Sequence, residues 1–158
     1  MAFGGSGFFT ISIKDILEST AILDWSAGTW NLALFPDSIT PDYTVTAANT
    51  AYDSGVWTAA AELDDPADWP TGGPVLASQA VDAEQPGAGQ VRLDADDVSQ
   101  VNTTITNARG CLIYMGSIGS PVVDQGLLSV DFGSDFSTTN GTFAITWDSN
   151  GVAFFDVW

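Results

Sequence analysis

The chain has 158 residues, of which 45% are hydrophobic and 11% aromatic, so it can bury a core of its own. Three basic residues stand against 20 acidic ones, and there is no histidine. A net charge of −17 repels phosphate groups, so we expect no nucleic acid and no membrane as a partner. Without histidine the commonest general base and metal ligand is missing, so we expect no enzymatic activity, metal or cofactor.

The sequence predicts a short N-terminal arm followed by one domain. Residues 1–9 are rich in glycine, which predicts a flexible N-terminal arm, and residues 10–158 are expected to form a single β-rich domain. The arm has no positively charged segment before a long apolar run, so we do not expect export through a signal peptide. Ser12 is a suitable N-cap for a short helix ending near Ser19, because the apolar residues after it recur at helical spacing.

The rest of the chain has the pattern of short strands separated by turns. The Pro- and Gly-rich residues 38–89 predict long loops with one helical turn at 47–53. Strands are expected at residues 29–35, 75–81, 90–94, 103–115, 127–132, 142–147 and 152–158. Turn residues at 148–151 predict that the last two strands pair as a C-terminal hairpin. The expected fold is mainly β: an antiparallel β-sandwich or barrel-like domain with one short N-terminal helix and long loops.

Large aromatic side chains in the arm and in the loop region are the candidate protein-contact residues. They are Phe3, Phe8, Phe9, Trp57 and Trp69. The two tryptophans have three interpretations: they plug the ends of the sandwich, they contact another subunit, or they form a platform on which a sugar stacks. The first two are favoured.

Charged side chains give one candidate ion pair and one candidate cation site. Arg109 lies beside the apolar run 111–115, where a guanidinium needs a carboxylate partner, and Asp131 or Asp135 can provide it. The acids Asp94, Asp96 and Asp97 are close enough in sequence to converge on Ca²⁺. They lack the glycine and glutamate of an EF-hand loop, so a solvated strand end is favoured there and no metal is predicted.

Five segments resemble those of a group of small virion proteins of tailed bacteriophages. They are residues 30–35, 93–98, 106–114, 128–133 and 140–147. The resemblance extends over most of the chain, with no correspondence in residues 64–89, and its motifs are structural.

The resemblance implies a non-enzymatic virion protein, with two places in the virion open. The first is a capsid decoration or cement protein, bound to the major capsid protein on the outer surface of the shell. The alternative is a minor tail or tail-tip protein that binds a receptor or glycan. An acidic domain suits the outer face of a capsid, away from packaged DNA. We expect a homotrimer, which closed symmetry at local three-fold positions would form, or another homo-oligomer.

Overall fold

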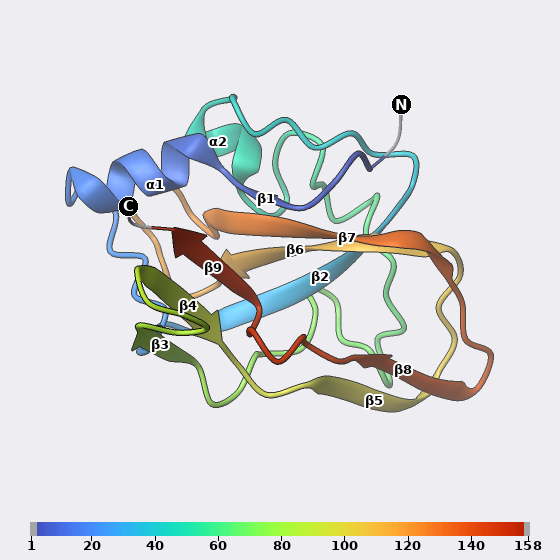
Figure 1. Ribbon diagram of the computed structural model, residues 1–158. Coiled ribbons are helices and arrows are strands. Elements are labelled where there is room, and N and C mark those ends of the chain that lie inside the picture. The colour runs from blue at the N-terminus through green and yellow to red at the C-terminus, as the bar shows by residue number, and fades with distance from the viewer. Residues whose placement is uncertain (1–2, 157–158) are drawn as a thin grey trace.

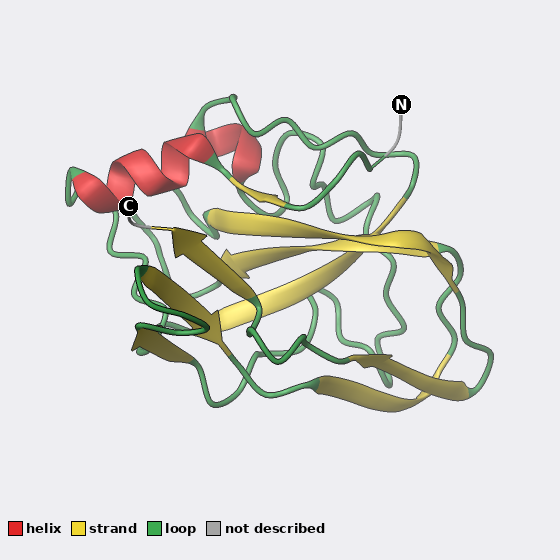
Figure 2. Ribbon diagram, viewed as in Figure 1, coloured by secondary structure: helices red, strands yellow, loops and turns green. Residues whose placement is uncertain are grey.

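The computed structural model describes residues 3–156 and shows a mainly β protein, with 38% strand and 8% helix. Its sheets are antiparallel and do not close into a barrel, and a short helix near the N-terminus completes the expected fold class. Figures 1 and 2 show two layers of strands, with helices and long loops on the outside of one of them.

The first layer is a four-stranded sheet in the order β1-β7-β6-β2. β6, inside the sheet, and β2, at its edge, have nearly continuous apolar sequences, as expected for strands that are covered on both faces. The strands are β1 (Gly7–Phe8), β7 (Gly126–Phe136), β6 (Ala108–Met115) and β2 (Trp30–Pro36).

The second layer is made of two smaller sheets that face the first (Figure 1). One has the order β3-β4-β9 and the other pairs β5 with β8. The main core fills the space between the layers and includes Trp30 of β2, Leu93 of β4 and Phe143 of β8. The strands are β3 (Ala80–Ala83), β4 (Gln90–Asp94), β9 (Ala153–Asp156), β5 (Val98–Thr103) and β8 (Gly141–Ile145).

The outer face of the first layer carries a second core under the loops. Alternate residues of β2 and β6, such as Phe35 and Leu112, point to this face and pack around Trp57. The helices α1 (Thr10–Leu17) and α2 (Ala47–Thr50) lie on the same side of the sheet (Figure 2).

The arm expected to be flexible is part of the fold over the residues that the structure describes. Gly7 and Phe8 pair with β7, and Phe3 and Phe9 are buried. Gly7 leaves room for a close contact, because a Cβ there would lie 3.2 Å from the ring of Tyr43. Residues 1–2 lie outside the described residues.

The short helix exists, but its beginning differs from the prediction. α1 begins at Thr10 and has Phe9 at its N-cap, without a side-chain capping bond. Ser12 lies inside the helix, fully buried, and its hydroxyl donates a hydrogen bond of 2.6 Å to the carbonyl oxygen of Gly126. A serine that looked like a cap therefore attaches the helix to β7.

The predicted C-terminal hairpin is wrong. β8 pairs with β5 and β9 pairs with β4, so the two strands belong to different sheets. The turn itself is present, since Asp148 and Gly151 form an isolated bridge, but it redirects the chain from one small sheet to the other. The expected strand at 103–115 also begins too early: Thr103 is the last residue of β5, residues 104–107 lie outside any strand, and β6 begins at Ala108, after Asn107 in a left-handed conformation with φ of 58°.

Candidate functional site

Four of the five aromatic candidates for protein contact are buried, and for Trp57 and Trp69 this favours the interpretation that they fill space inside the domain. Phe3, Phe9, Trp57 and Trp69 are 0–3% exposed, so no partner can reach them in the folded domain. Trp57 makes edge contacts with Phe3, Phe9 and Phe35, and Trp69 makes one with Phe143. Both tryptophans fill the interior, and neither offers a platform for a sugar.

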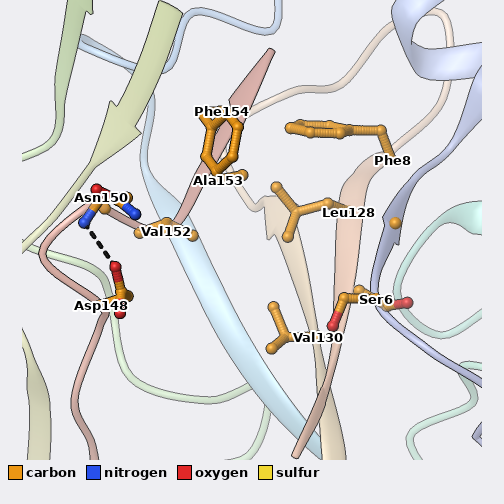
Figure 3. Close-up of a pocket in the computed structure, with 12 residues that line it drawn as sticks. Ser6, Phe8, Leu128, Val130, Asp148, Asn150, Val152, Ala153 and Phe154 are labelled. Atoms are coloured by element: carbon orange, nitrogen blue, oxygen red, sulfur yellow. Dashed lines mark hydrogen bonds between the residues drawn. The ribbon is translucent and has the colours of Figure 1, made fainter. Parts of the chain in front are cut away.

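Phe8 is the exception, because it lines a hollow at the open side of the sandwich. One wall of this hollow consists of Phe8, Leu128 and Val130, and the opposite wall includes Val152 and Phe154 (Figure 3). We call this hollow, with a volume of about 500 Å³ and lined by residues 6–8, 128–130, 148 and 150–154, the edge groove. Phe155 of β9 stacks on Phe8 with ring centroids 4.4 Å apart, which holds the two walls together at one end.

A second hollow, of about 360 Å³, lies further along β7. β7 contributes Val130 to the edge groove and Phe132 to the second hollow, and residues two apart on a strand share a face. Phe154 and Phe136 are 43% and 49% exposed along this side of the molecule. The open side of the sandwich is therefore a largely apolar surface.

The strand edges explain why this side is open. β9 is the last strand of its sheet, and among residues 3–156 no other strand pairs with its outer edge. β1 continues the facing sheet over only two residues. The backbone groups on the outer edge of β9 are thus available to a further strand.

The charge of the domain that is not paired is negative, because each cation forms an ion pair with a carboxylate of the same chain. Lys14 pairs with Glu18, Arg92 with Asp82 at 2.7 Å, and Arg109 with Asp131 at 2.8 Å. These three are all the lysines and arginines of the chain. The rest of its carboxylates give the surface a strongly negative charge.

The ion pair expected at Arg109 is present and has further partners. The guanidinium Nε donates to Oδ1 of Asp131, and Nη1 lies 3.7 Å from Asp37 and 3.8 Å from Asp135. Gly133 N–H and the Arg109 guanidinium hold the pKa of Asp131 below its ordinary value, although its burial opposes this. Both sequence candidates, Asp131 and Asp135, therefore surround the arginine.

Replacing Arg109 by alanine is expected to lower the thermal unfolding midpoint more than replacing Lys14 by alanine. The first change leaves Asp131, Asp135 and Asp37 close together without a cation, whereas Lys14 has one exposed partner in the same helix. Because Asp131 has a lowered pKa, its pairing stabilises the fold above its ordinary pKa of 3.8 and is lost as the pH falls through the lowered value. Thermal scans of both variants at neutral and acid pH measure this, and equal midpoints at neutral pH would contradict it.

The three acids at 94–97 do not converge. Asp96 accepts a hydrogen bond from the hydroxyl of Ser78, and Asp97 accepts one from the backbone N–H of Trp147. Asp94 lies 3.3 Å from Arg92. Within residues 3–156 no group of three acidic or cysteine side chains is arranged to hold a metal ion.

A buried acid that the sequence did not suggest is Glu62. Its carboxylate accepts hydrogen bonds from the N–H of Gly72, at 2.8 and 3.0 Å, and from the hydroxyl of Tyr52, at 2.6 Å. The hydroxyl of Tyr114 donates to the carbonyl oxygen of Gly72, and its ring stacks on that of Tyr52. Burial raises the pKa of Glu62. The cluster holds the loop at Gly72 against β6.

Comparison with known proteins assigns the chain to no protein family. No family model, curated protein or solved structure matches the chain.

Proposed function

We propose that the protein is a non-enzymatic structural protein of a virion, which binds the outer surface of the shell formed by the major capsid protein and stabilises it. The observation that carries this proposal is the edge groove, an apolar hollow beside a free strand edge. Surfaces of this kind are suited to contact with protein, because the apolar walls are covered and the backbone groups are satisfied on binding. The resemblance of five segments to virion proteins of tailed phages supports a place in a virion.

The charge of the domain supports a position on the outside of a capsid. At −17, the chain is repelled by packaged DNA, and its cations are occupied by its own carboxylates. In residues 3–156, no helix is long and apolar enough to cross a bilayer. We propose a homotrimer at local three-fold positions of the shell, where many weak contacts add to its stability by mass action.

We favour this role over the tail-tip alternative for one reason. Glycan binding required exposed tryptophans, and Trp57 and Trp69 are buried. A receptor-binding role at the tail would therefore need another sugar platform.

Copy number in purified virions tests the proposal. The ratio of this protein to the major capsid protein, measured by quantitative mass spectrometry with isotope-labelled peptides, should correspond to hundreds of copies in each particle. A known tail protein, counted in the same sample, serves as the internal control. A ratio equal to that of the tail protein would contradict the capsid role.

A further inference from the structure

We propose that the edge groove takes an extended, basic segment of a partner protein, which adds as a strand to the free edge of β9. This inference rests on the proposed function for the partner being a protein, and it adds the mode of binding and the chemistry of the segment. β9 has four residues, so its edge is about 13 Å long and accommodates a short peptide strand.

The two walls of the edge groove fit alternate side chains of such a strand. A strand beside β9 would close the open side of the sandwich, and its inward side chains would meet Phe8, Leu128 and Val130 (Figure 3). Its backbone would pair with the outer edge of β9. Phe154, which is 43% exposed, would then be covered at the rim.

The fold protects another edge but leaves this one open. The chain crosses the outer edge of β2, where Leu34 bridges to Leu63 and Asn31 bridges to Val75. Soluble proteins commonly shield an edge strand with lysine, proline or a bulge, because a bare edge recruits other strands. β9 has the sequence Ala-Phe-Phe-Asp, with neither lysine nor proline. Its open edge is therefore unprotected by these means.

The charge around the groove selects a basic segment. Asp148 lines the groove and Asp156 ends β9, and neither forms an ion pair with a described residue, since the hydrogen bonds that their side chains accept come from neutral groups. A second copy of the chain would bring a further charge of −17 to this surface. Lysine or arginine in the partner strand would compensate both carboxylates, with an affinity that falls as salt is added.

Two synthetic peptides of about seven residues test the charge and the mode of binding together. One alternates lysine with valine, and the other alternates glutamate with valine. Fluorescence anisotropy should show that the lysine peptide binds and that added salt weakens it, while the glutamate peptide does not bind. Hydrogen exchange should show new protection of amides in β9 and none in β3, the opposite edge of the same sheet.

A matched pair of variants tests whether the peptide binds at the edge groove. Phe154→Lys should weaken binding about tenfold or more, because it removes an apolar contact and adds a repelling charge. Val81→Lys on β3 is the control, since Val81 is 49% exposed at the opposite edge of the same sheet, and it should leave binding unchanged. Circular dichroism checks that both variants fold.

Three results would overturn the inference: equal binding of the two peptides, an equal effect of the two variants, or peptide binding without protection of β9. Protection of β9 by a second copy of the chain in concentrated solution would also overturn it. These outcomes are independent of the copy number. If the protein is present in hundreds of copies but does not bind the lysine peptide, the proposed function stands and this inference fails. If it binds the peptide but is rare in virions, this inference stands and the proposed function fails.

Discussion

Replacing Gly73 by alanine is expected to destabilise the domain by more than about 4 kcal/mol, enough to leave much of it unfolded. Gly73 has φ of 78°, and a Cβ there would lie 1.7 Å from the carbonyl oxygen of Leu32 in β2. The neighbouring residue Pro74 accepts a hydrogen bond from the N–H of Leu32, so the loop cannot withdraw without losing contact with the sheet. Urea unfolding followed by tryptophan fluorescence measures the loss.

Gly133→Ala is the matched control for this change. Gly133 has the same φ of 78°, but nothing lies within 4 Å of the position that a Cβ would take there. This variant should therefore lose only the cost of a left-handed alanine, about 1–2 kcal/mol. Equal losses in the two variants would show that backbone conformation alone, and not the contact with β2, requires Gly73.

Replacing Glu62 by alanine is expected to cost roughly 2–5 kcal/mol. The change removes the acceptor for the buried N–H of Gly72 and for the hydroxyl of the half-buried Tyr52. An unpaired buried group costs about 1–3 kcal/mol, and the hydroxyl of Tyr52 costs less than a fully buried one because water reaches it in part. Glu62→Gln keeps an acceptor of the same shape and should retain most of the stability at acid pH. A loss as large in the glutamine variant as in the alanine variant would contradict this account.

The glutamine variant also has a pH signature. Burial raises the pKa of Glu62 above its ordinary value of 4.5, so between these two values the folded state holds a proton that the unfolded state has released. The stability contributed by Glu62 is therefore full below pH 4.5 and falls as the pH rises through the raised pKa. Compared with the wild type, Glu62→Gln should gain stability over that range, as urea unfolding at several pH values would show. A constant difference would contradict the raised pKa.

Local patterns in the sequence were sufficient for several strands but not for their partners. Alternation and turn residues placed β2, β4 and β7 within a few residues of their observed limits, because these signals lie within each strand. Pairing depends on contacts between distant residues. β9 pairs with β4 and not with β8, its neighbour in sequence, and Phe155 of β9 stacks on Phe8 near the other end of the chain. No turn motif carries that information.

The candidate site was largely hidden from sequence reasoning for the same reason. The edge groove joins residues 6–8, 128–130, 148 and 150–154, and of these only Phe8 was a candidate. Trp57 and Trp69 lie in loops rich in polar and small residues, so the sequence left packing inside the domain, contact with a subunit and sugar stacking all open. Those loops fold over the sheets and bury both side chains. Arg109 was predictable because a cation beside an apolar run needs a carboxylate within reach.

The proposed place of the domain on a capsid is tested most directly by a cryo-EM map of virions from the phage that we propose to encode this chain, since the map fixes the position and the contacts of the domain at once. The account predicts density for the domain on the outer surface of the capsid, at many equivalent positions, with the edge groove turned toward a strand of the major capsid protein. Density confined to the tail, or an edge groove facing solvent at every position, would contradict it.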